Sequence, residues 1–134
     1  MHIDGQCHCG FVTYEAEIDP GSVLICHCTA CQRLTGSVYR VTVTARRDAI
    51  RLTADRPQVY IRTGDSERKR LQHFCPKCGS PLFTSGTGED DETWGIRWGS
   101  INQRASLKPQ HQIWCAYAMD WFDELSALPG RPGD

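Results

Sequence analysis

The chain has 134 residues, of which 40% are hydrophobic and 23% are charged, and its formal net charge is -1. This length favours a single domain, and this balance is typical of a globular protein with a buried core. No apolar run approaches the roughly 18 residues of a membrane-spanning helix, and the first residues lack the basic and apolar regions of a secretory signal. We therefore expect a cytoplasmic protein with no membrane partner.

Short segments of alternating apolar and polar residues follow one another along the chain. Apolar residues occupy every second position from Val12 to Ile18, which is the pattern of a half-buried strand. Further strands are predicted at 37–45, 49–54, 57–63, 93–100 and 112–119. Helical turns are expected only after Thr29 and within 121–128, and the acidic residues 88–92 are expected to form a solvated loop. The sequence thus predicts a single mainly β domain over residues 1–126, followed by a tail at 127–134.

Eight cysteines in a cytoplasmic chain of this size need an explanation, because disulfides are rare in that compartment. Seven of them fall into three clusters. These are Cys7-x-Cys9, Cys26-x-Cys28-x-x-Cys31 and Cys75-x-x-Cys78. In the last cluster Pro76 favours a turn and Gly79 permits an unusual backbone conformation after it, which brings two thiolates round one metal. The spacings indicate metal binding, with a redox dithiol as the alternative.

Seven thiolates cannot fill two closed sites of four ligands each. The two pairs lie far apart in the sequence, and pairing them in a single site is the usual arrangement of a zinc ribbon. This leaves Cys26, Cys28 and Cys31 as a local trio. Three protein ligands with a water or substrate in the fourth position are typical of a catalytic zinc. Tetrahedral thiolate sites also accept iron, so zinc is the preferred metal rather than the only candidate.

Three segments of the chain, GQCHCGFVTYE, CHCTACQRLTGS and FCPKCGSPLF, resemble in order and spacing the motifs of the glutathione-dependent formaldehyde-activating enzymes, a family that includes centromere protein V. A weaker similarity extends over 99–114 to Trp121. At 101–103 this chain has Ile-Asn-Gln, where many members carry Leu-Asp-Asp.

The resemblance implies an Mss4-like β fold with two zinc ions per chain. By motif, Cys7, Cys9, Cys75 and Cys78 would hold the structural zinc, and Cys26, Cys28 and Cys31 the catalytic one, which would be the more labile. The implied activity is that of a carbon–sulfur lyase, joining glutathione and formaldehyde to give S-hydroxymethylglutathione.

The chemistry itself favours a thiol as substrate. An open zinc lowers the pKa of a bound thiol, whereas three thiolate ligands make the zinc a weaker Lewis acid for a carbonyl. Glutathione carries two carboxylates, so Arg33 and Arg40, which flank the trio, are candidate substrate contacts. The alternative for both arginines is ordinary surface charge.

Other residues with metal-binding or aromatic side chains have simpler interpretations. His8 and His27 each sit between two cysteines, so alternation should turn them away from the metal. Cys115 lies in an apolar run and is expected to be a buried small hydrophobe. His73 and His111 receive no role. The four tryptophans are expected to fill the core; they are Trp94, Trp98, Trp114 and Trp121.

A second function of a different class stays open: a zinc-stabilised, non-catalytic module that binds protein or nucleic acid. Deprotonating seven thiols and adding two divalent ions changes the net charge from -1 to about -4. That charge disfavours nucleic acid, whose binding depends on neutralising phosphates. The basic runs 46–47 and 68–70 are usual for solvated faces. The enzyme is the preferred interpretation.

Overall fold

The structure is a computed structural model that describes residues 1–64 and 67–134. Within these ranges it contains ten β-strands, one α-helix and several short 3-10 turns, so the predicted mainly β fold is confirmed. The strands are β1 (His2–Gln6), β2 (Thr13–Glu17), β3 (Val23–Cys26), β4 (Arg40–Arg46), β5 (Ile50–Leu52), β6 (Gln58–Thr63), β7 (Lys69–Phe74), β8 (Pro81–Ser85), β9 (Thr93–Arg97) and β10 (His111–Ile113). The helix is α1 (Thr29–Thr35), and the 3-10 turns cover Arg47–Ala49, Gly88–Asp91, Trp98–Ser100, Arg104–Ser106, Cys115–Tyr117 and Phe122–Ala127.

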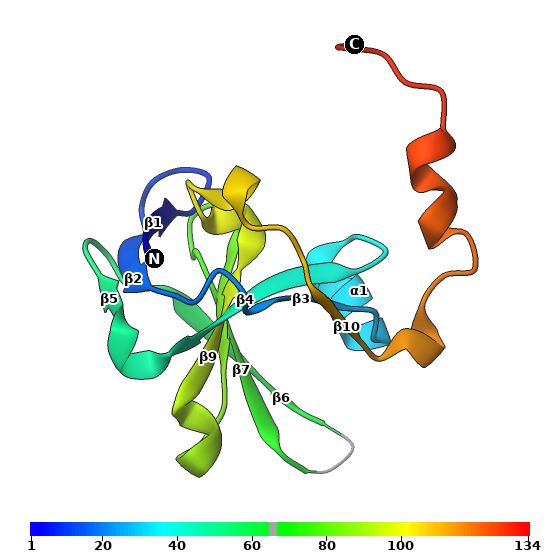
Figure 1. Cartoon of the computed structure of the whole chain (residues 1–134). Coiled ribbons are helices and arrows are strands. Elements are labelled where there is room, and N and C mark those ends of the chain that lie inside the picture. The colour runs from blue at the N-terminus through cyan, green and yellow to red at the C-terminus, as the bar shows by residue number, and fades with distance from the viewer. Residues whose placement is uncertain (65–66) are drawn as a thin grey trace.

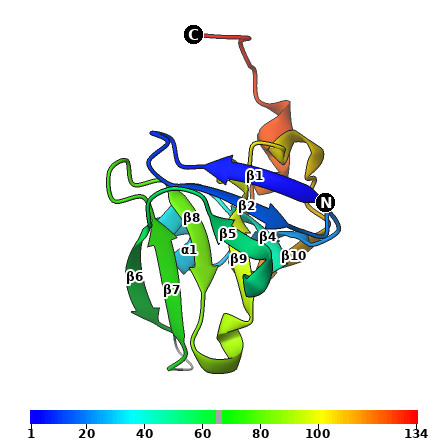
Figure 2. The same ribbon diagram turned by 90° about the vertical axis from the view of Figure 1, so that its left-hand side faces the viewer.

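The strands form two sheets (Figure 1). The smaller sheet has the order β1-β2-β5, and the larger has the order β10-β3-β4-β9-β8-β7-β6. Within the described ranges the paired strands are antiparallel, apart from β10, which runs parallel to β3. Figure 2 shows β1 crossing the direction of β7 and β8. The turn between β1 and β2 and the turn between β7 and β8 therefore belong to different sheets.

The hydrophobic core is shared by the two sheets. The predicted apolar face from Val12 to Ile18 is buried, and its alternation is that of a strand with one covered side. The ring of Tyr14 on β2 meets Phe83 on β8 edge to face, with centroids 4.9 Å apart. The buried Tyr14 hydroxyl hydrogen-bonds the Ser100 hydroxyl at 2.6 Å, so this polar atom is satisfied inside the core. Packing of this kind fixes the smaller sheet on the larger one.

Gly5 on β1 permits this close approach. A methyl group added there would lie 2.5 Å from the carbonyl oxygen of Ser100 and still closer to the Tyr14 hydroxyl. We expect Gly5→Ala to lower the free energy of unfolding by about 1–3 kcal/mol, because overpacking against backbone cannot be relieved by a side-chain rotation. Urea denaturation measures the loss. The control is Gly99→Ala, where the added methyl meets no atom within 4 Å; equal stability of the two variants would contradict the argument.

The strand predicted over 112–119 is only partly present. β10 ends at Ile113 because Trp114 takes a left-handed backbone conformation, with φ of 56°, and a 3-10 turn follows. Cys115 is exposed, so the expectation that it is a buried hydrophobe is wrong. Trp114 and Trp121 are also exposed, contrary to the expectation that they fill the core. Phe122 still packs against His27, with ring centroids 4.8 Å apart, and Figure 1 shows the last residues leading away from both sheets. The domain boundary at residue 126 stays a prediction.

Trp94 and Trp98, by contrast, pack against the core as predicted. The two polar atoms of these indoles are both satisfied. The Trp94 indole N–H donates to Asp91 at 2.8 Å, and that of Trp98 donates to the carbonyl oxygen of Leu107 at 2.9 Å. Each ring thus contributes apolar area while its N–H keeps a partner.

The acidic segment 88–92 contains the 3-10 turn Gly88–Asp91 and is not a purely solvated loop. Asp90 pairs with Arg68, and Asp91 pairs with Arg47, and both carboxylates are half-buried. Arg46 pairs with Asp48 in the same way. The basic runs are therefore partly neutralised by carboxylates, which agrees with their interpretation as solvated faces rather than as a phosphate-binding surface. None of the helices in the described part of the chain is long and apolar enough to cross a membrane.

Candidate metal centres

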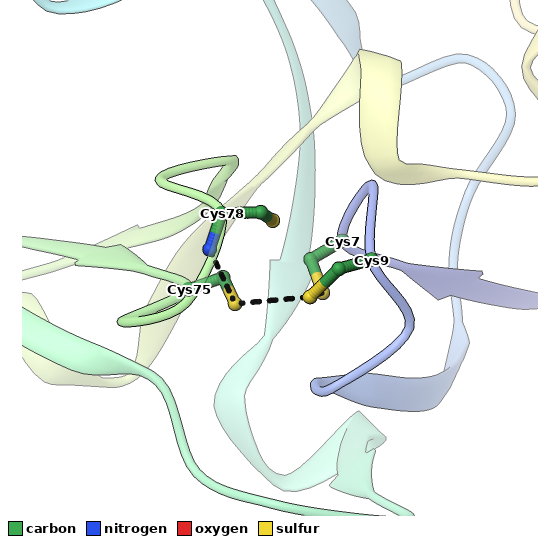
Figure 3. Close-up of side chains that lie close together, drawn as sticks. All are labelled: Cys7, Cys9, Cys75 and Cys78. Atoms are coloured by element: carbon green, nitrogen blue, oxygen red, sulfur yellow. Dashed lines mark hydrogen bonds between the residues drawn. The ribbon is translucent and has the colours of Figure 1, made fainter.

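The first cysteine cluster joins the two sheets. Cys7 and Cys9 lie in the turn between β1 and β2, and Cys75 and Cys78 lie in the turn between β7 and β8 (Figure 3). The four sulfur atoms lie within 4.8 Å of one another, as the pairing of the two distant motifs predicted. Cys7 and Cys75 are buried, whereas Cys9 and Cys78 are exposed. The cluster therefore has one side in the core and one side open to solvent.

The two turns that carry these cysteines have the same backbone pattern. The N–H of Cys7 donates to the carbonyl oxygen of Val12 at 3.0 Å, and that of Cys75 donates to Ser80 at 3.0 Å. After Cys78 the chain reverses at Gly79, whose φ of 78° favours glycine and whose N–H donates to Cys75 at 2.9 Å. This is the role that the sequence predicted for Gly79. Each turn closes tightly enough to aim two sulfur atoms at one point.

Backbone N–H groups also point at the sulfur atoms. Val12 donates to Cys7 Sγ at 3.3 Å, and Lys77 and Cys78 both donate to Cys75 Sγ at 3.4 Å. Donors of this kind favour the thiolate over the thiol, since they stabilise negative charge on sulfur. Burial opposes the charged form of Cys7, but the N–H of Val12 and then the neighbouring cysteines outweigh it and lower the pKa of Cys7. At Cys75 the two donors fix the direction of the sulfur.

Ser80 connects the two turns and acts on the exposed sulfur of Cys78. Its hydroxyl accepts a hydrogen bond from the His8 N–H at 2.9 Å and lies 3.2 Å from Cys78 Sγ. Hydrogen bonds from the Ser80 side chain and then from its backbone lower the pKa of Cys78 to about 5. Cys78 is thus a thiolate at neutral pH, which is the form that binds metals.

The sulfur geometry fits a tetrahedral metal. The Cys7 and Cys9 sulfurs are 3.7 Å apart, and those of Cys9 and Cys75 are 3.8 Å apart. A tetrahedron with zinc–sulfur bonds of about 2.3 Å has edges of about 3.8 Å. Four thiolates at these spacings can hold a zinc ion, and iron would fit the same donor set.

The second cluster is the trio Cys26, Cys28 and Cys31, whose sulfurs also lie within 4.8 Å of one another. Cys26 is the last residue of β3 and is buried, Cys28 is the N-cap of α1, and Cys31 lies in the first turn of the helix. The Cys28 sulfur accepts the N–H of Cys31 at 3.3 Å, as a capping side chain does. The interaction between Cys26 and Cys31 lowers the pKa of the former and raises that of the latter, so the two sulfurs compete for one proton. Replacing that proton by a metal removes the competition.

The histidines between the cysteines take no part in either cluster. Within the described residues the metal-binding groups consist of cysteine sulfurs alone. His27 is fully buried, and its Nε2 lies 2.9 Å from the side-chain oxygen of Gln112. Gln112 lies on β10, which pairs with β3. His8 is exposed. Neither histidine belongs to a metal-binding group, as expected from their alternation with the cysteines.

The two arginines proposed from the sequence occupy different environments. Arg33 is exposed on the last turn of α1. Arg40, directly opposite Cys26 in the β3–β4 register, has only 4% of its surface exposed, so the interpretation as surface charge does not hold for it. Sequence reasoning missed Arg97 on β9, which is also buried. Its position between Ile96 and Trp98 was the only sign in the sequence that it could be buried.

A cavity of about 720 Å³ lies beside these groups. Its wall includes Cys7 of the first cluster, the segment that follows α1 with Tyr39 and Arg40, and Arg97 and Trp98 from β9 and the turn after it. The volume is within the range of small-molecule sites in proteins. The cavity is therefore bordered by a cysteine of one cluster and by arginines close to the other.

Together these features define a class: a β domain with one four-cysteine cluster between its sheets and one three-cysteine cluster at the start of its helix, both able to hold metal ions. A family model described as "Glutathione-dependent formaldehyde-activating enzyme" matches residues 2–117, and the chain belongs to this family. The crystal structure of a Rhodobacter sphaeroides protein is similar with a TM-score of 0.61, covering 81% of this chain and 98% of that chain. At 21% identity this likeness shows the fold alone. No curated protein matches the chain.

Proposed function

We propose that the protein is a zinc-dependent enzyme of the carbon–sulfur lyase type that makes or breaks the bond between a thiol and an aldehyde-derived carbon. Glutathione and formaldehyde are the first pair to consider, because the family name points to them. In the forward direction the thiol sulfur bonds to the carbonyl carbon, the carbonyl π bond breaks, and the thiol proton ends on the oxygen. The observation that carries the proposal is the unequal donor count of the two clusters, four sulfurs in one and three in the other.

The two clusters have different roles in this proposal. Cys7, Cys9, Cys75 and Cys78 hold a closed structural zinc, since four sulfurs complete a tetrahedron. Cys26, Cys28 and Cys31 would hold a second zinc with three sulfurs, which leaves room for a substrate ligand. A zinc ion there would lower the pKa of a thiol that binds it. Cys28, as the N-cap of α1, ties the start of the helix to this cluster.

Arg40 and Arg33 are the proposed contacts for the carboxylates of glutathione. Arg40 lies on the cavity wall next to the trio and is held in a buried position, which suits recognition of a fixed part of the substrate. Arg33 is exposed on the helix and suits a second, more distant carboxylate. Guanidinium groups bind carboxylates with paired hydrogen bonds, so each contact adds orientation as well as charge.

The test is the rate of thiol–aldehyde exchange followed by NMR with zinc-loaded protein. Spontaneous hemithioacetal formation is fast, so the rate must be compared with and without protein. We expect acceleration by the wild type and none by Cys28→Ser, because two thiolates cannot hold the zinc as three do. Cys115→Ser is the matched control, since Cys115 is exposed and belongs to neither cluster; it should accelerate exchange as the wild type does.

A second readout separates binding from catalysis. Cobalt in place of zinc gives a visible spectrum that changes when a thiol takes the open position. If a panel of thiols neither accelerated exchange nor altered this spectrum, the enzyme proposal would fail. The non-catalytic zinc-stabilised module would then be the better interpretation.

A further inference from the structure

Two buried arginines line the same cavity and have no acidic partner among the described residues. Arg40 on β4 is 4% exposed and Arg97 on β9 is 8% exposed, and both line the 720 Å³ cavity. Buried charged groups are normally paired, because the loss of hydration is otherwise uncompensated. Over residues 1–64 and 67–134, no salt bridge with an aspartate or glutamate within 4.0 Å involves either arginine. The two guanidiniums need another source of negative charge.

Neutral oxygens hold the two side chains in place. The side-chain oxygen of Gln72 on β7 accepts from Arg97 at 2.8 Å and from Arg40 at 3.5 Å. Arg97 also donates to the Thr42 hydroxyl at 2.8 Å, and the Gln72 amide donates to the Thr84 hydroxyl at 3.4 Å. Each guanidinium carries more N–H donors than these contacts use. The two short contacts fix the direction of the Arg97 guanidinium, and the longer one links Arg40 to the same Gln72 oxygen, without neutralising either charge.

The charges around this pair do not balance. Burial, followed by the repulsion of Arg40, lowers the pKa of Arg97 to about 9, while the sulfurs of Cys31 and Cys26 favour its charged form. A divalent ion held by the three thiolates of the trio would leave one net negative charge. Two guanidiniums bring two positive charges, so the region keeps one that is unmatched. A monovalent anion in the cavity would restore neutrality.

We propose that Arg40 and Arg97, positioned by Gln72, form a binding site for a carboxylate of the thiol substrate, so that the protein selects thiols carrying an acidic group. The choice of a thiol rests on the proposed function; the carboxylate site rests on the arginines themselves. A carboxylate is the anion whose two oxygens match the fork of a guanidinium. Arg97 thereby joins the specificity-determining residues, and Gln72 is a positioning residue that acts through the two arginines.

A purely structural role for the two arginines makes a different prediction. If they served only as counter-ions for the thiolates, the protein would bind thiols without regard to a second charge. Gln72→Glu distinguishes the two possibilities, because it keeps the shape of the side chain and places a carboxylate between the guanidiniums. The variant should fold, since it supplies a partner to buried charges. It should also compete with any carboxylate that enters the cavity.

The experiment compares three small thiols on the zinc-loaded full chain: 3-mercaptopropionate, which carries a carboxylate, 2-mercaptoethanol, which is neutral, and cysteamine, which is cationic. Dissociation constants come from calorimetry. We expect the wild type to bind 3-mercaptopropionate about tenfold or more tightly than 2-mercaptoethanol, since charge-assisted hydrogen bonds are the stronger kind. Cysteamine should bind most weakly. In Gln72→Glu and in Arg97→Gln the ratio of the dissociation constants of 2-mercaptoethanol and 3-mercaptopropionate should fall towards one.

The matched control is Arg46→Gln, which removes an arginine from the same strand as Arg40. Arg46 is exposed and already paired with Asp48, and it should keep the wild-type preference. Propionate, titrated at millimolar concentration while the arginine Nε resonances are followed by NMR, tests the carboxylate site without a thiol. It should shift the arginine signals of the wild type and not those of Gln72→Glu.

The outcomes separate this inference from the proposed function. Equal affinity of the wild type for the three thiols, with no effect of propionate, would overturn the carboxylate site and leave the thiol chemistry standing. Failure of all three thiols to bind, with propionate still shifting the arginine signals, would remove the proposed function and keep the anion site. If neither thiols nor propionate bound, both would be wrong. A preference unchanged in Gln72→Glu would also overturn the carboxylate site.

Discussion

Replacing Cys75 with serine is expected to leave the chain unfolded or insoluble. Cys75 is fully buried in the turn between β7 and β8, and it shares the four-sulfur cluster with Cys7 and Cys9 from the other sheet. Structural zinc sites contribute about 10–16 kcal/mol of apparent binding free energy, and whole domains are stable by only about 5–15 kcal/mol. Loss of this metal removes as much free energy as the folded state has to spare. Circular dichroism melting curves and metal analysis measure the result.

The control for this variant is Cys115→Ser, which changes an exposed cysteine outside both clusters. It should melt as the wild type does and contain the same amount of metal. A Cys75→Ser protein with an unchanged melting curve and full metal content would show that the four-cysteine cluster is not a structural metal site.

A chelator is expected to remove the two metals in separate phases. The trio offers three sulfurs from a segment of six residues, and Cys28 and Cys31 are both partly exposed. The other cluster has four sulfurs from turns of two sheets, two of them buried, so its metal should leave more slowly, and its loss should release the contact between the sheets. We expect the first phase to proceed without a change in circular dichroism and the second to coincide with unfolding. A colorimetric zinc reagent follows the release while the dichroism is recorded.

The variant Cys31→Ser shows which phase of metal release belongs to which cluster. This variant should lack the fast phase and keep the slow one with its loss of structure. Release of both metals from the wild type in one uniform phase, or loss of structure during the fast phase, would be evidence for two equivalent sites. Either result would contradict the distinct roles proposed for the clusters.

The parts of the fold that could be predicted from the sequence are those with a regular alternation. The face from Val12 to Ile18 is buried because β2 has one covered side, which is the situation that alternation encodes. β1, β3, β7 and β8 were not predicted. In β7 charged, polar and apolar residues follow one another without a period of two, and its last three residues line a second, smaller cavity of about 340 Å³. Burial that depends on distant strands leaves no local pattern.

The C-terminal part of the chain shows why an apolar run is a weak signal by itself. The segment from Gln112 onward contains many apolar residues, which favoured a strand and a buried Cys115. Trp114 instead adopts a left-handed conformation at the end of β10, and Cys115, Tyr117 and Trp121 after it are exposed. Nothing in the residue type predicts it, because tryptophan rarely adopts a positive φ.

The cysteine clusters were the most predictable part of the site. Spacing alone brings Cys75 close to Cys78, and the count of seven thiols separates a set of four from a set of three. Arg97 and Gln72 could not be found in this way. A single arginine in a strand carries no sign of whether it faces solvent or a cavity, and Gln72 becomes informative only when β7, β9 and β4 lie in one sheet.

The two halves of the four-sulfur cluster lie far apart in the sequence, so the ribosome makes them at different times. Cys9 and Cys75 are 66 residues apart, so at 5–20 residues per second the first pair of thiols waits roughly 3 to 13 s for the second. During this interval the emerging chain carries Cys7 and Cys9 without their partners and must keep them reduced. β10, which pairs with the strand that ends at Cys26, is made later still. The trio therefore acquires its final surroundings only after the sulfurs that clamp the two sheets have been synthesised.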